Sequence, residues 1–119
     1  MDLRHQWRMS NKYNNVPKRY NGRTYHSTLE AEFAQVLDLM KKGKLIKEIK
    51  PQPSFRLDVN GKHICNIIPD FFVIDKDDQE IIYEVKGKET DTWKIKAKLF
   101  QALYPQYKYE VVKKGDFKL

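Results

Sequence analysis

The chain has 119 residues, of which 40% are hydrophobic and 33% charged, and its formal net charge is +7. This length suits one domain with a modest core, and the single cysteine, Cys65, excludes an internal disulfide and a cysteine-based zinc site. No apolar run approaches the length of a membrane span, and the polar N-terminus lacks the apolar segment of a signal peptide. We therefore expect a cytoplasmic protein with no membrane partner.

The basic excess is concentrated near the N-terminus. Residues 1–26 contain six Lys or Arg against one Asp, whereas the remaining 93 residues hold 17 basic and 15 acidic groups. We interpret residues 1–22 as a basic arm and residues 23–119 as the folded domain. Aromatic residues such as Trp7 and Tyr20 lie among the arm's charges, where they can stack on bases while the cations follow phosphates. This composition favours a nucleic-acid partner, although a solvated tail that packs an aromatic residue on the domain would have the same composition.

The first elements of the chain are a small hairpin and a helix. Residues 20–25 favour a hairpin, because Asn21-Gly22 is a turn signal. Ser27-Thr28-Leu29-Glu30 is a capping-box sequence, and apolar residues follow it at helical spacing. The pattern predicts a helix that starts after Ser27 and ends at Gly43.

Short strands are predicted after this helix. They cover residues 45–49, 55–59, 64–68, 71–74 and 81–86. Asn60-Gly61 joins the second and third of them as a hairpin with a type I′ turn. The fourth strand follows Pro69-Asp70, and we expect it to continue the same meander.

A second helix is predicted over roughly residues 92–104, and a last strand over residues 107–112. A strand that follows a helix can return parallel to the strand before it, so the sheet is expected to be mixed. The fold class is therefore α/β in the α+β sense. Lys96 falls inside the apolar arc of the second helix, where a lysine must extend to the surface or meet an anion.

Three residues in the middle of the chain suit phosphodiester cleavage. Glu84 and Lys86 are two apart on a predicted strand, so both side chains lie on one face of it. Asp70 opens the preceding apolar run, and a hairpin would bring it toward Glu84. Two converging carboxylates suit Mg²⁺, and a neighbouring lysine can orient a metal-bound water and offset charge on a phosphate. A hairpin with a solvated face would show the same three residue types.

This pattern resembles the PD-(D/E)XK nuclease superfamily, which has the restriction-endonuclease-like fold. More of the chain is similar to a family of small nuclease-like proteins of phages and prophages, often described only as a domain of unknown function. The similar segments are Tyr25 to Ala31, Pro51 to Phe55, Pro69 to Phe71, Glu84 to Gly87, Thr90-Asp91, Lys94 to Phe100, and Tyr104-Pro105. A phage-encoded member would act in the cytoplasm of its bacterial host. The resemblance spans roughly residues 20 to 112. It implies an α-β-β-β-α-β core with a mixed central sheet flanked by helices.

The resemblance also assigns roles to single residues. Asp70 and Glu84 match the Mg²⁺ ligands, for which Mn²⁺ can substitute, and Lys86 matches the catalytic lysine. Glu30 matches a first-helix acid that contacts a metal or its water, but the capping box alone would explain it as well. The backbone carbonyl of Val85 is expected to be a further ligand. The residues expected to contact DNA are Arg19, Arg23, Gln52, Lys94, Lys96 and Lys98.

The function expected from this resemblance is Mg²⁺-dependent endonucleolytic cleavage of DNA. The chain is too short for a separate sequence-reading domain, which favours structure-selective cleavage of branched DNA, such as a Holliday junction, in phage recombination or packaging. By analogy with small resolvases, a homodimer would place two sites on two strands. Two alternatives stay open: a non-catalytic nucleic-acid-binding accessory module, and a partner-dependent nicking subunit of a packaging or transposition machine.

Overall fold

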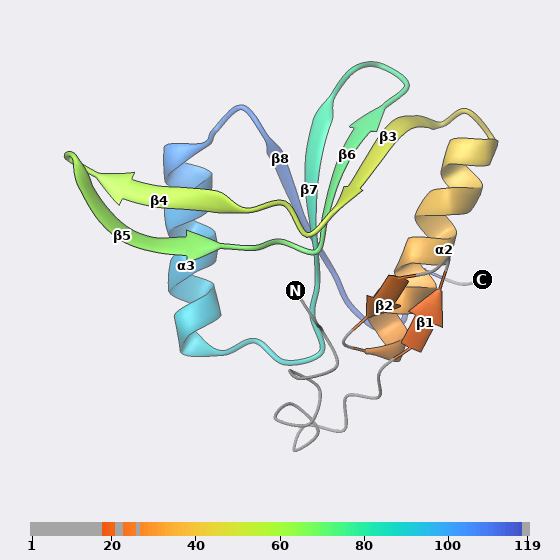
Figure 1. Cartoon of the computed structure of the whole chain (residues 1–119), viewed down its shortest axis with the longest axis horizontal. Helices are drawn as coiled ribbons and strands as arrows, with labels where there is room; N and C mark the ends of the chain where they lie inside the picture. Colours follow the sequence, from red (N-terminus) through yellow and green to blue (C-terminus); the bar gives the residue numbers. More distant parts are fainter. Residues whose placement is uncertain (1–17, 21–22, 26, 118–119) are drawn as a thin grey trace.

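The computed structural model describes residues 18–20, 23–25 and 27–117 (Figure 1). Its elements are β1 (Lys18–Tyr20), β2 (Arg23–Tyr25), α2 (Thr28–Lys42), β3 (Ile46–Pro51), β4 (Phe55–Val59), β5 (Lys62–Ile67), β6 (Phe71–Asp75), β7 (Glu80–Val85), α3 (Asp91–Leu103) and β8 (Lys108–Val112). Neither of the described helices is long and apolar enough to cross a membrane.

The N-terminal hairpin is formed by β1 and β2, which pair antiparallel from Lys18–Tyr25 to Tyr20–Arg23. This hairpin lies against α2 (Figure 1). The predicted Asn21-Gly22 turn and residues 1–17 of the predicted arm lie outside the described residues, while arm residues 18–20 form β1.

Helix α2 begins as the capping box predicts. Ser27 is the N-cap, and its side-chain oxygen accepts a hydrogen bond from the backbone N–H of Glu30 at 3.1 Å. At the other end Lys41 and Lys42 occupy the last turn, where their positive charges interact favourably with the negative end of the helix dipole. The N–H of Gly43 donates to the Leu39 carbonyl at 2.9 Å, and the helix stops there.

The central sheet is mixed and has the order β3-β6-β7-β8. Strand β6 is antiparallel to both β3 and β7, whereas β8 returns parallel to β7 after α3. Reading α2, β3, β6, β7, α3 and β8 in chain order gives the predicted α-β-β-β-α-β series. The α+β class is confirmed, and the arrangement is compatible with a restriction-endonuclease-like core.

The single continuous meander predicted from the sequence is wrong. Strands β4 and β5 pair with each other in a separate two-stranded sheet, and β3 pairs with β6 across this insertion, with Pro51 opposite Phe71. Prolines cannot donate to a strand ladder, and the connector Pro51-Gln52-Pro53 places Gln52 at φ +53°. The chain therefore leaves the sheet at Gln52 and rejoins it after Pro69.

The turn at the tip of this hairpin is the predicted one, because Asn60 and Gly61 both have positive φ, at +51° and +78°. We expect Gly61→Ala to lower the free energy of unfolding by about 1 kcal/mol, since an L side chain is strained in this region. Gly87→Ala is the matched control, because its Cβ would meet open space at an ordinary φ. Urea unfolding measures both, and equal effects of the two substitutions would contradict this account.

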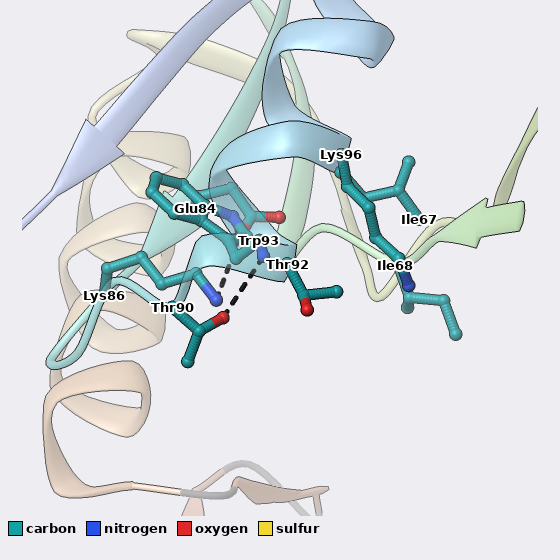
Figure 2. A pocket seen from close by; sticks show the side chains of 8 residues that line it. All are labelled: Ile67, Ile68, Glu84, Lys86, Thr90, Thr92, Trp93 and Lys96. Carbon is teal, nitrogen blue, oxygen red and sulfur yellow. Dashed lines mark hydrogen bonds and ion pairs between the residues drawn. The ribbon is translucent and has the colours of Figure 1, made fainter.

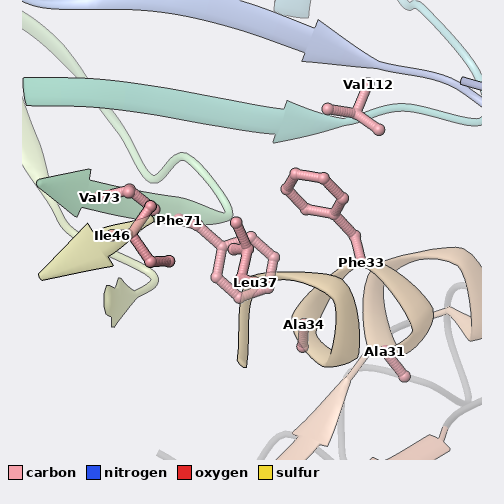
Figure 3. Close-up of a cluster of buried hydrophobic side chains, with 8 residues drawn as sticks. All are labelled: Ala31, Phe33, Ala34, Leu37, Ile46, Phe71, Val73 and Val112. Atoms are coloured by element: carbon pink, nitrogen blue, oxygen red, sulfur yellow. The ribbon is translucent and has the colours of Figure 1, made fainter. Parts of the chain in front are cut away.

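Two clusters of buried side chains lie on opposite faces of the central sheet. On one face Phe33 and Leu37 of α2 pack toward Phe71 (Figure 3). On the other face Phe100 of α3 packs with Ile82, and the β4–β5 hairpin contributes Leu57 and Ile67 to this second cluster. Because strand residues alternate, the face of β7 that carries Ile82 also carries Glu84, with Lys86 just beyond the strand end. These two polar residues therefore face α3.

Candidate functional site

Asp70 lies immediately before β6, beside the C-terminal end of β7. Its backbone N–H donates to the Tyr83 carbonyl at 3.2 Å, which continues the pairing of the two strands by one residue. Its side-chain Oδ2 accepts a hydrogen bond from the backbone N–H of Val85 at 2.6 Å. The hairpin expected from the sequence is thus present, and it sets Asp70 beside Glu84.

Glu84 is buried, with 3% of its surface exposed, but its carboxylate has polar partners (Figure 2). Its Oε2 accepts a hydrogen bond from the indole Nε1–H of Trp93 at 3.0 Å. The same oxygen lies 3.7 Å from the Nζ of Lys86. That ammonium is also 4.9 Å from the centroid of the Trp93 ring, within the range of a cation–π contact. Trp93 therefore contacts both Glu84 and Lys86.

Glu30 reaches this site from the first turn of α2. It is buried, with 4% exposed, and a hydrogen bond from its side chain lowers the pKa of Asp70. Because Ser27 caps the helix through the backbone N–H of Glu30, the capping contact leaves the Glu30 carboxyl group available for Asp70. The two interpretations of Glu30 are therefore compatible.

Gln52 is joined to Asp70 through the backbone. Its backbone N–H donates to the Asp70 carbonyl at 2.8 Å. A non-glycine residue at positive φ is uncommon, and such positions tend to cluster at functional sites. The structure thus brings Gln52 to the site through its backbone.

The electrostatics of the two carboxyl groups are unusual. Burial raises the pKa of Asp70 to about 6, against the opposing effects of the Val85 hydrogen bond and the Lys86 charge. Burial, followed by the negative charge of Asp70, raises the pKa of Glu84 to about 7. The hydrogen bond from Trp93 and the charge of Lys86 act in the opposite direction on Glu84. Two acids whose negative charges repel each other are a favourable place for a cation.

The donor set suits the predicted Mg²⁺. Asp70 and Glu84 offer carboxylate oxygens, which a hard cation prefers, and a divalent ion would neutralise their mutual repulsion. Within the described residues no three His, Cys, Asp or Glu side chains form a ready metal group. A cation here would accordingly keep water ligands, as Mg²⁺ usually does. The structure ties Val85 to Asp70 through its amide, and the Val85 carbonyl stays a predicted ligand.

A pocket of about 250 Å³ opens beside Glu84 (Figure 2). It is lined by Ile67, Ile68, Glu84, Lys86, Thr90, Thr92, Trp93 and Lys96. Lys96 is half-buried, so the lysine that seemed misplaced in the apolar arc points to this pocket.

The other residues predicted to contact DNA are spread more widely. Lys94 and Lys98 are exposed on α3 and do not line the pocket. Arg19 and Arg23 belong to β1 and β2, and their side chains lie outside the described part of the chain. Of the predicted DNA contacts, Lys96 lines the same pocket as Glu84, and Gln52 is bonded to the backbone of Asp70.

Trp93 is the site residue that sequence reasoning missed. Helical periodicity places Trp93 on the apolar arc of the second helix, but its indole N–H donates to Glu84. One signal was available, since a partly buried tryptophan usually finds an acceptor for its indole N–H. Thr90 caps α3 by accepting from the Trp93 backbone N–H at 3.1 Å, which fixes the position of Trp93 in the first turn.

We expect Trp93→Phe to raise the pKa of Glu84 further. Phenylalanine keeps the ring but removes the N–H donor that stabilises the Glu84 carboxylate. Titration of the ¹³C carboxyl shifts in metal-free protein would measure the change. An unchanged Glu84 titration in a folded variant would show that the indole hydrogen bond has no role in it.

The fold and site together define an α+β protein with a carboxylate pair and a lysine at the end of a central strand. The chain belongs to the family described as "Protein of unknown function (DUF1064)", whose model matches residues 10–118. No curated protein matches the chain.

Proposed function

We propose that this protein is a PD-(D/E)XK-type endonuclease that hydrolyses DNA phosphodiester bonds with Mg²⁺. The observation that carries the proposal is the arrangement of Asp70, Glu84 and Lys86. Two adjoining carboxyl groups share one buried site, and a lysine lies 3.7 Å from one of them. A structural ion pair has no need for the second, repelling acid.

In this proposal Asp70 and Glu84 hold the metal, with the Val85 carbonyl as a further ligand. A bound Mg²⁺ would supply Lewis-acid stabilisation of the phosphate and a water of lowered pKa. The Val85 amide fixes one oxygen of Asp70, and the Trp93 indole fixes one oxygen of Glu84. The other oxygen of each carboxylate is then oriented without further loss of rotamer freedom.

Lys86 is the residue assigned to the reacting water and the phosphate. Its ammonium is held between the Glu84 carboxylate and the face of Trp93, so its position is set before substrate arrives. From there it can orient the attacking water and offset the negative charge that develops on the phosphate. Glu30 helps to position Asp70 through a side-chain hydrogen bond.

The wider substrate contacts follow from the basic residues. Lys94, Lys98 and the basic N-terminal segment would contact the DNA backbone, so binding should weaken steeply with salt. Branched DNA is the proposed preferred substrate, with two copies of the chain acting on two strands. A role in phage recombination or packaging belongs to the same proposal.

Cleavage of labelled DNA tests the proposal directly. The substrates are a four-way junction, a linear duplex and a single strand, each with Mg²⁺, Mn²⁺ or EDTA. We expect metal-dependent cutting by the wild type, none by Lys86→Ala, and nearly normal cutting by Lys76→Ala, which removes an exposed lysine of the turn between β6 and β7.

Other outcomes would favour the alternatives. If DNA binds but no substrate is cut and calorimetry detects no Mg²⁺ or Mn²⁺ binding, the protein is an accessory binding module. If metal binds but cutting requires an added partner, a nicking subunit of a larger machine is indicated.

A further inference from the structure

We propose that the pocket beside Glu84 is a subsite for one nucleotide adjoining the scissile phosphate. In this subsite Lys96 binds the neighbouring phosphate, and Ile68 packs against the sugar or base. The inference rests on the proposed function and adds a substrate contact to it.

The two lysines of the pocket are at opposite ends of it. Lys86 lies with Glu84 and Trp93, whereas the Lys96 side chain extends away from them toward Ile68 (Figure 2). If Lys86 binds the scissile phosphate, Lys96 can bind a second phosphate on the other side of one sugar. The Glu84 carboxylate repels anions from the space between the two lysines. Two separated phosphates therefore suit the pocket better than one central anion.

The apolar wall of the pocket includes an isoleucine that does not belong to the core. Ile68 is 58% exposed, although its neighbour Ile67 is buried at 4%. Burial of an isoleucine side chain is favourable, and a pocket with a few polar groups beside such a surface is typical of a ligand site. Ile68 is also separated from Asp70 only by the buried Pro69, so its distance from the carboxylates is fixed by the chain.

A hydroxyl group completes the subsite. Thr92 points into the pocket between the two lysines, where it can donate to a sugar or phosphate oxygen (Figure 2). The hydroxyl of Thr90 differs, because it already accepts the Trp93 backbone N–H. Two cations, a hydroxyl and an aliphatic wall match the order phosphate, sugar and phosphate of a nucleic-acid strand.

The test uses deoxythymidine 3′,5′-bisphosphate as the probe, because it carries two phosphates on one nucleoside. Its binding to the full-length protein is measured by calorimetry, with and without Mg²⁺. We expect Lys96→Gln to weaken binding about tenfold, as for loss of one charge-assisted contact. Ile68→Ala should weaken it about threefold, since part of a side chain's apolar contact is lost.

Each variant has a matched control. Lys76→Gln removes the same charge from an exposed position in the turn between β6 and β7, and Ile64→Ala removes an isoleucine of β5 that is 56% exposed. Neither residue lines the pocket. Both controls should bind the probe within about twofold of the wild type, as expected for surface substitutions away from the site. Equal losses in Lys96→Gln and Lys76→Gln, or no binding by the wild type, would overturn the subsite.

The failure of this inference can be told apart from failure of the proposed function. Metal-dependent DNA cleavage combined with equal losses in variants and controls would overturn the subsite alone. Selective loss of probe binding in Lys96→Gln, without cleavage of any DNA, would overturn the nuclease proposal and leave a nucleotide-binding pocket.

Discussion

Asp70→Asn should reduce DNA cleavage by at least about 10³-fold, because it removes a charge from the site on which metal-ion stabilisation of several kcal/mol depends. Asparagine has nearly the same shape, and its side-chain oxygen can still accept from the Val85 N–H. The fold should therefore survive while cation binding is lost. Single-turnover cleavage and Mg²⁺ calorimetry on the same preparation measure the two effects.

A control for this substitution is Asp58→Asn, which makes the same change of charge on the exposed β4–β5 hairpin. Its cleavage rate and Mg²⁺ affinity should match those of the wild type. If Asp70→Asn bound Mg²⁺ as tightly as the wild type, Asp70 would have no place as a ligand. If it unfolded, its thermal transition would show that, and Glu84→Gln would take its place in the assay.

The second large effect concerns stability and pH in metal-free protein. Because Asp70 and Glu84 have raised pKa values when folded, the folded state binds protons that the unfolded state releases. The stabilisation linked to protonation is complete below the ordinary carboxyl pKa values and is lost as pH rises through the folded values of about 6 and about 7. Unfolding in EDTA should therefore become easier from pH 5 to pH 8, by an amount on the order of 2 to 3 kcal/mol.

Glu84→Gln should remove much of this pH dependence. At pH 8 in EDTA it should melt roughly 5 °C above the wild type, and at pH 4.5 the two should melt together. Glu48→Gln, on the exposed edge of β3, should follow the wild-type curve. Added Mg²⁺ should raise the melting temperature of the wild type at pH 8. A wild-type melting temperature that is constant or rising from pH 5 to pH 8 in EDTA would contradict the buried carboxyl pair.

Local patterns in the sequence were sufficient to predict much of this architecture. Period-two spacing put Glu84 and Lys86 on one face, and the capping box located the start of α2. The pairing of β3 with β6 could not be read in this way, because it joins residues separated by a whole hairpin. The proline connector showed where the chain would bend, but not which strand it would rejoin.

The candidate site shows the same division between local and non-local information. The proximity of Asp70 to Glu84 follows from one hairpin, so the sequence could predict it. The contact of Trp93 with Glu84 depends on how α3 packs on the sheet, which helical periodicity alone does not determine. Periodicity singled out Lys96 as anomalous, but only the packed pocket separates it from Lys94 and Lys98.

The inserted β4–β5 hairpin has both of its roots beside the carboxylates. Gln52 leads into it and Asp70 follows it, and a backbone hydrogen bond of 2.8 Å joins the two residues. Its Asn60-Gly61 tip lies at the opposite end of two paired strands and is exposed. Exposed turns of this kind tolerate added sequence, whereas residues at the roots do not. The tip is thus the point at which evolution, or an engineer, can graft a recognition loop or a fused domain while the chemistry at the roots is kept intact.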